Sequence, residues 1–128
     1  MDFHYTKIVN LDFQKAIDKV TEALKEQGFG VLTEIDVQST LKNKIDVDFR
    51  PYKILGACNP HFAHKALTAV DKIGVFLPCN VVVQVNVAGK TEVSAVSPMA
   101  SMITVESPKL AGIAYEVEER LKSVIASL

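Results

Sequence analysis

The pattern of hydrophobic and polar residues along the chain predicts five β-strands. In some stretches apolar residues alternate with polar ones, and in others they form short β-branched runs, as they do in strands with one buried face. These stretches are residues 2–9, 29–35, 52–57, 79–87 and 91–96. The turn residues Ala88, Gly89 and Lys90 separate the last two stretches. We therefore expect these two strands to form an antiparallel hairpin.

Apolar residues spaced three or four positions apart predict helices between these strands. Each predicted helix begins at a residue type that caps helix amino termini well. These capping residues are Asp12, Asp36, Asn59 and Ser107. The first helix should end at Gly28, and the last should run to the end of the chain. Residues 97–106 show no regular pattern.

The order of these elements predicts an α+β domain. We expect a mostly antiparallel five-stranded sheet, with the two long helices packed on one face and short helices elsewhere. A doubly wound parallel sheet would require strands and helices to alternate throughout, and the hairpin breaks that alternation. The 128 residues fit a single domain, so we assign residues 1–128 to one α+β unit.

Composition excludes several classes of partner. The chain has 14 basic and 15 acidic residues, so no strong net charge attracts nucleic acid or anionic lipid. Its most apolar stretch is interrupted by Pro78 and by three polar residues, which rules out a membrane span. The amino terminus also lacks the features of a signal peptide. We therefore expect a cytoplasmic protein in which Cys58 and Cys79 are thiols.

The turn at Cys58, Asn59 and Pro60 is the strongest candidate for a site. Cys58 ends a predicted strand just before Asn59 and Pro60 start a helix, where free amides favour an anion or a thiolate. The alternative is a small buried cysteine at a packing corner. Cys79 shares the apolar face of its strand, which favours a buried structural role. The two thiols could form a redox or metal pair only if their strand ends are neighbours.

Other chemistry-bearing residues indicate no catalytic or metal site. His61 and His64 lie three apart on the polar face of a predicted helix and lack the other ligands of a zinc site, so we expect them in solvent. Glu116, Glu118 and Glu119 are also expected in solvent. Nucleotide-binding and hydrolase motifs are absent from the sequence. No catalytic residue and no cofactor can be assigned.

Four stretches of the sequence resemble a known family. They are TEIDVQSTLKNK, DFRPYKILGACNP, AHKAL and IGVFLPCNVVV. They are similar to the bacterial and archaeal family catalogued as domain of unknown function 302, and the resemblance spans nearly the whole chain. It implies an α+β fold related to a single half of the TATA-binding-protein saddle, and a homodimer. It implies no activity.

We interpret the chain as a non-enzymatic domain that acts as a homodimer and binds a small anionic or polar ligand or a partner. The expected site lies at strand ends beside a helix amino terminus. Its residues are Cys58, Asn59, Pro60, Cys79, Asn80 and Tyr52. One alternative is a thiol- or metal-dependent redox enzyme that uses Cys58 and Cys79. Another is a structural subunit of a larger assembly.

Overall fold

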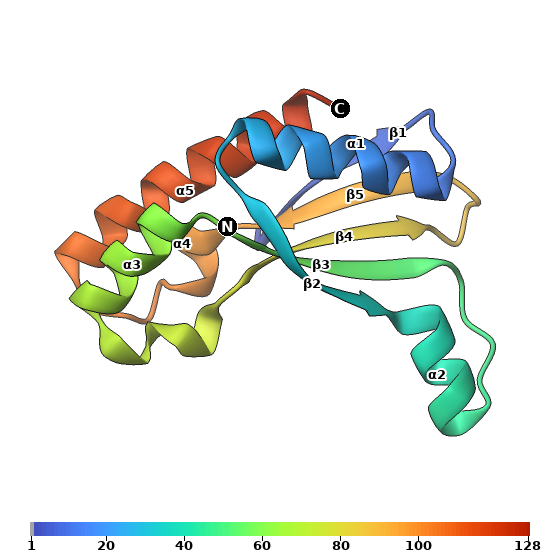
Figure 1. Ribbon diagram of the computed structural model, residues 1–128, viewed down its shortest axis with the longest axis horizontal. Coiled ribbons are helices and arrows are strands. Elements are labelled where there is room, and N and C mark those ends of the chain that lie inside the picture. Colours follow the sequence, from blue (N-terminus) through green and yellow to red (C-terminus); the bar gives the residue numbers. More distant parts are fainter. Residues whose placement is uncertain (1) are drawn as a thin grey trace.

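Five strands form one antiparallel sheet in the order β1-β5-β4-β3-β2, as seen in a computed structural model that describes residues 2–128 (Figure 1). The strands are β1 (His4–Val9), β2 (Gly30–Asp36), β3 (Tyr52–Cys58), β4 (Cys79–Val85) and β5 (Thr91–Val96). Every neighbouring pair is antiparallel. The predicted α+β fold with an open antiparallel sheet is therefore confirmed.

The helices lie mainly on one side of this sheet. They are α1 (Phe13–Glu26), α2 (Val37–Ile45), α3 (Pro60–Ala69), the 3₁₀ helix η1 (Asp71–Phe76), α4 (Pro98–Ser101) and α5 (Pro108–Ala126). The two long helices, α1 and α5, cover the same face of the sheet (Figure 1). Helix α2 projects beyond one end of the sheet and buries none of its residues (Figure 1).

The predicted helix starts are confirmed by hydrogen bonds. Each capping side chain accepts a bond from the amide three residues further along the chain. The distances are 2.8 Å at Asp12, 3.0 Å at Asp36, 3.5 Å at Asn59 and 3.2 Å at Ser107. Gly28 follows the first helix with a φ of +87°, a left-handed conformation that suits glycine. Local sequence chemistry therefore sets these boundaries.

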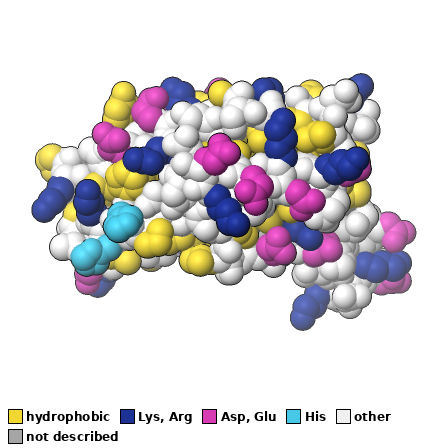
Figure 2. All heavy atoms as spheres, turned by 45° about the horizontal axis from the view of Figure 1, so that its top comes forward, with side chains coloured by type: hydrophobic (Ala, Val, Ile, Leu, Met, Phe, Trp, Pro, Cys, Tyr) yellow, Lys and Arg dark blue, Asp and Glu magenta, His cyan; other side chains and the backbone are white. Residues whose placement is uncertain are grey.

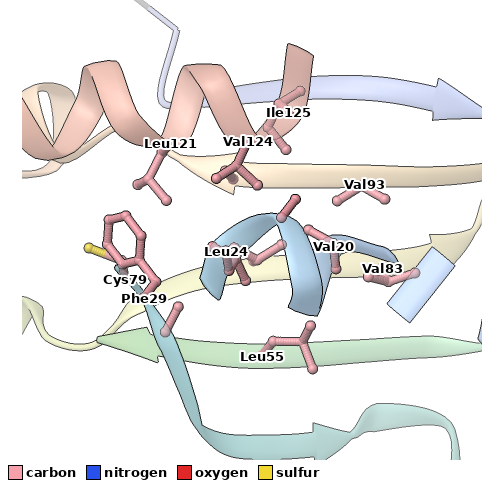
Figure 3. Packing of buried hydrophobic residues seen from close by; sticks show 14 of the residues in the cluster. Val20, Leu24, Phe29, Leu55, Cys79, Val83, Val93, Leu121, Val124 and Ile125 are labelled. Atoms are coloured by element: carbon pink, nitrogen blue, oxygen red, sulfur yellow. The ribbon is translucent and has the colours of Figure 1, made fainter. Parts of the chain in front are cut away.

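The hydrophobic core fills the space between the sheet and helices α1 and α5 (Figure 3). Leu24 of α1, Leu121 of α5 and Val81 of β4 are completely buried there. Cys79 belongs to the same cluster, as its place on the apolar face of its strand indicated. Val87 does not, because β4 ends at Val85, and Val87 is 94% exposed beside the hairpin turn. The predicted strand was therefore two residues too long.

The segment from 97 to 106 is more regular than its sequence suggested. Ser97 is buried, and its hydroxyl accepts a hydrogen bond from the amide of Ala100 at 3.1 Å. This bond caps the single turn of α4, which also has Pro98 at its first position. Helix α4 packs against α5 and closes one end of the domain (Figure 1).

Glu118 corrects a sequence-based expectation. We expected its carboxylate in solvent, but only 8% of the residue is exposed. The carboxylate accepts hydrogen bonds from the hydroxyl of Ser97, from the amide of Met99 at 3.2 Å and from the hydroxyl of Tyr5 at 3.0 Å. These bonds join α5 to the start of α4 and to β1, so Glu118 is a structural residue.

The other face of the sheet carries no helix within the described residues 2–128 (Figure 1). The burial pattern alternates along β1, β4 and β5, and the strand register aligns the outward residues of the sheet in rows. One row across the sheet is Thr6, Ser94, Val82, Ile54 and Ile35. We call this surface the open sheet face.

Candidate functional site

The ends of β3 and β4 bring the two cysteines close together. Ala57 is the register partner of Cys79, so Cys58 lies one residue beyond the paired position. Helix α3 begins immediately after β3, with Asn59 as its cap. The sequence alone did not show whether these two strand ends are neighbours. The antiparallel register between β3 and β4 makes them neighbours.

A cavity of about 340 Å³ lies at this end of the sheet, between α3, α5 and the ends of β2, β3 and β4. Its walls are almost entirely apolar, and α4 and the segment that follows η1 contribute to them. Residues that form the walls include Phe29, Phe62, Leu77, Met102, Leu110 and Val117. The volume lies within the range of small-molecule sites, roughly 300 to 1,000 Å³. Each of these wall residues is an apolar type common in ordinary cores, so no sequence signal distinguished them as cavity residues.

The structure separates the six predicted site residues into three places. Cys58, Asn59 and Cys79 line the cavity. Pro60 lies outside it, exposed at the first position of α3. Tyr52 and Asn80 lie on the open sheet face, where they line a separate groove of about 430 Å³. The six residues therefore do not form one site.

Asn59 supplies the polar group of the cavity wall that is most deeply buried. Only 8% of the residue is exposed. Its Oδ1 accepts a bond from the amide of Phe62 at 3.5 Å, and its Nδ2 donates to the carbonyl of Gln27 at 3.4 Å. Both distances are long for hydrogen bonds. Nδ2 carries two hydrogens, and the Gln27 carbonyl is its one hydrogen-bond acceptor among the described residues, so its second hydrogen can bond a further acceptor.

Gly56 allows Thr33 and Pro78 to pack closely beside the cavity. A Cβ atom at position 56 would lie 2.2 Å from Oγ1 of Thr33 and 2.8 Å from Cγ of Pro78. Both neighbours also line the cavity. A glycine is thus required at position 56 for this part of the wall to have its present shape.

The chemistry of the Cys79 thiol is set mainly by its burial. Burial, and to a smaller extent the neighbouring Cys58, raises the pKa of the Cys79 thiol to about 11. At neutral pH Cys79 is therefore protonated and a poor nucleophile. Both cysteines are free thiols. Within residues 2–128, no three His, Cys, Asp or Glu side chains gather closely enough to hold a metal ion, and His61 and His64 are exposed on α3 as expected.

The raised pKa of Cys79 predicts a pH-dependent loss of stability. The folded protein holds the thiol proton up to about pH 11, whereas the unfolded chain releases it near the ordinary pKa of 9.0. The stabilisation is complete below pH 9 and is lost as the pH rises to about 11. Urea unfolding of the wild type should show a decrease in the free energy of unfolding of roughly 2 to 3 kcal/mol over this interval. Cys79→Ala should lack this component and Cys58→Ala should retain it, whereas equal pH profiles for all three proteins would contradict the assignment.

Comparisons with known proteins identify the family. Residues 5–128 match the family model described as "Domain of unknown function DUF302". The chain is 35% identical to an uncharacterized conserved DUF302 protein from Bacillus stearothermophilus, whose crystal structure superposes with a TM-score of 0.90 over 97% of this chain and 96% of that chain. No curated protein matches the chain. The sequence motifs, the open antiparallel sheet and both matches agree, and the chain belongs to the DUF302 family.

Proposed function

We propose that this protein binds a small, largely apolar molecule in the cavity between α3, α5 and the ends of β3 and β4. The main support for this proposal is the chemistry of the cavity wall. Apolar side chains form almost all of the wall of this cavity of about 340 Å³, which is open to solvent on one side. A ligand that displaces water from these walls gains the hydrophobic free energy of the buried area. We propose no catalytic step for the cavity.

The lining favours a different ligand from the anion or polar molecule that we expected. At the start of α3, Pro60 has no amide hydrogen and the amide of Phe62 donates to Asn59. An anion would therefore lose its hydration without gaining enough donors, which is costly in an apolar site. The cavity instead suits an apolar body with one hydrogen-bond acceptor, such as a carbonyl oxygen, placed near Nδ2 of Asn59.

Cys79 is suited to a place in the cavity wall rather than to nucleophilic attack. Its pKa of about 11 leaves the thiol protonated at neutral pH. Cys58 and Cys79 then act as soft, slightly polar parts of the wall.

We also propose that two copies of the chain pair through the open sheet face. Glu92 is the single carboxylate among the outward strand residues described there, and Arg50 donates a hydrogen bond at 2.8 Å to Gln84, the register partner of Glu92. The rest of this face is rich in apolar and neutral residues. In a two-fold pair the acidic group of each copy can face the basic group of the other, so the surface is self-complementary. Pairing would bury Ile8 and Ile35, which are exposed in the single chain.

Sedimentation tests this pairing. It should give twice the chain mass of 14.0 kDa, and a monomer at micromolar concentration would contradict the pairing.

Titration calorimetry with 2-nonanone tests the binding proposal. This ketone has an apolar chain and a single carbonyl, so it matches the chemistry of the cavity. We expect a dissociation constant on the order of 0.1 mM. The ten non-hydrogen atoms of the ketone can supply the binding free energy that this affinity requires. Inorganic phosphate, the matching test for an anion site, should give no heat of binding at the same concentrations. Binding of phosphate but not of the ketone would overturn the proposal.

A further inference from the structure

The guanidinium of Arg120 lies beside the wall of the cavity. Val117 lines the cavity, and Arg120 is three residues further along α5, so the two side chains occupy neighbouring positions on that helix. The Cζ atom of Arg120 also lies 5.1 Å from the centre of the Phe62 ring, another part of the cavity wall. Both Arg120 and Phe62 are half-buried. Arg120 therefore lies at the rim of the cavity.

Arg120 and Asn59 share one hydrogen-bond acceptor. Nη1 of Arg120 donates to the carbonyl of Gln27 at 3.2 Å, and Nδ2 of Asn59 donates to the same carbonyl at 3.4 Å. The two donors are therefore neighbours, one in the cavity wall and one at the rim. Both have hydrogens left over, because Nδ2 carries two of them and a guanidinium carries five. A second acceptor can thus bond both side chains.

Arg120 has no carboxylate partner among residues 2–128. Glu116 and Glu119 are close to it in sequence on α5, but neither lies within ion-pair distance, and Glu119 pairs with Lys122 at 3.6 Å instead. The carbonyl of Gln27 is the one hydrogen-bond acceptor of Arg120 in the described part of the chain. Arginine side chains are rarely withdrawn from water without a partner. The unused donors of Arg120 therefore indicate a place for an anionic group of a ligand.

We infer that the molecule bound in the cavity is an apolar chain that ends in a carboxylate, and that Arg120 and Asn59 bind this carboxylate at the rim. This inference rests on the proposed function and names the ligand class. One carboxylate oxygen accepts a bond from Nδ2 of Asn59 and the other accepts from the guanidinium. An anion deep in the cavity would lack donors, whereas a carboxylate at the rim gains these bonds and stays partly in water.

Direct contacts, rather than a broad positive field, provide this preference for a carboxylate. Figure 2 shows basic and acidic side chains mixed over the side of the molecule that α1 and α5 form. Lys65 of α3 is a second cation near the rim, with its Nζ 5.7 Å from the centre of the Phe62 ring. Lys65 is exposed, and water and salt screen an exposed charge strongly. Arg120 should therefore contribute more than Lys65.

Local sequence patterns could not reveal this arrangement. Arg120 is 93 residues away from Gln27, and Asn59 is 32 residues away from it. Along α5, Arg120 lies among the charged residues Glu119 and Lys122 and does not differ from them in pattern. Neither α5 nor any other helix within residues 2–128 is long and apolar enough to cross a membrane.

Titration calorimetry with nonanoate at neutral pH tests the inference. This ion has the same number of carbon atoms as 2-nonanone but carries a carboxylate in place of the ketone. It should bind about tenfold more tightly than the ketone at low salt, and the difference should shrink at high salt. Arg120→Gln should remove the preference for nonanoate and leave the affinity for the ketone within about twofold of the wild type.

Lys122→Gln is the matched control for the arginine substitution. It removes the same charge from the same helix, but Lys122 does not line the cavity and pairs with Glu119. This variant should keep the preference for nonanoate, and circular dichroism establishes that both variants are folded. An equal loss of preference in the two variants would reveal a general effect of charge and overturn the inference.

An NMR measurement on the wild type tests the same contact without any substitution. The chain has two arginines, Arg50 and Arg120, so their two side-chain Nε–H signals are readily assigned. Nonanoate should shift the signal of Arg120 and not that of Arg50, which donates to Gln84 on the open sheet face. An unchanged Arg120 signal at saturating nonanoate would overturn the inference.

The ketone titration separates this inference from the proposed function. If 2-nonanone binds and nonanoate binds no more tightly, carboxylate recognition is wrong and the cavity proposal stands. If neither molecule binds, the cavity proposal is wrong and the inference fails with it. Binding of nonanoate alone, lost in Arg120→Gln, would support the inference, with the carboxylate then required for binding.

Discussion

Glu118→Ala is expected to lower the free energy of unfolding by about 4 kcal/mol, which would make it one of the most damaging single changes in this chain. The substitution leaves the hydroxyl of Ser97, the amide of Met99 and the hydroxyl of Tyr5 without their acceptor. Ser97 is completely buried, so water cannot easily replace the carboxylate there. The junction between β1, α4 and α5 should loosen first, because the groups that bond Glu118 come from β1 and from the start of α4. Urea unfolding measures the loss.

Glu119→Ala is the matched control for this prediction. Glu119 is the next residue on α5, and its carboxylate is exposed in an ion pair with Lys122 at 3.6 Å. Exposed pairs of this kind contribute little, so the free energy of unfolding should change by less than about 0.5 kcal/mol. If both substitutions had equally small effects, Glu118 would not have the structural role that we assign to it.

Ala63→Phe is expected to reduce the affinity for 2-nonanone by at least about 100-fold. Ala63 lies on α3 and lines the cavity without being fully buried, so a larger side chain can enter the cavity while the helix stays in place. A phenyl ring there would occupy volume that the ligand needs. The loss corresponds to about 2.7 kcal/mol of binding free energy. Calorimetric titration of the purified variant measures it.

Thr68→Phe is the control for the cavity-filling change. Thr68 is on the same helix but is exposed, and it does not line the cavity. This variant should bind the ketone like the wild type. Circular dichroism and the unfolding midpoint of both variants establish that each is folded. Folded Ala63→Phe protein that binds the ketone with unchanged affinity would show that the ligand binds elsewhere.

The elements of the fold could be predicted because their signals are local. A capping residue such as Asp12 lies within one helical turn of the amide that it bonds, and the alternation in β4 is visible in seven consecutive residues. Glu118 shows where such reasoning fails. It is adjacent in sequence to exposed Glu119, but its partners Ser97 and Tyr5 lie 21 and 113 residues away. Long-range donors of this kind leave no local pattern.

The candidate site was predictable only in part for the same reason. The strand end and helix cap at Cys58 and Asn59 are local features, and both residues line the cavity. That Cys79 lies opposite Ala57 depends on the strand register, which the sequence left open. Whether the apolar side chains around them pack completely or enclose a cavity depends on how α3 and α5 meet the end of the sheet. The apolar character of the site therefore became visible only in the structure.

The most direct test of the central claim is the position of 2-nonanone on the protein, measured by amide NMR during a titration of the ¹⁵N-labelled chain. We predict that the largest shifts will fall on residues that line the cavity, including Cys58, Asn59, Ala63 and Val117. Residues of α2, such as Leu41, should not shift. Shifts confined to the open sheet face, or no shifts at ketone concentrations near saturation in water, would contradict the claim that this cavity is the binding site.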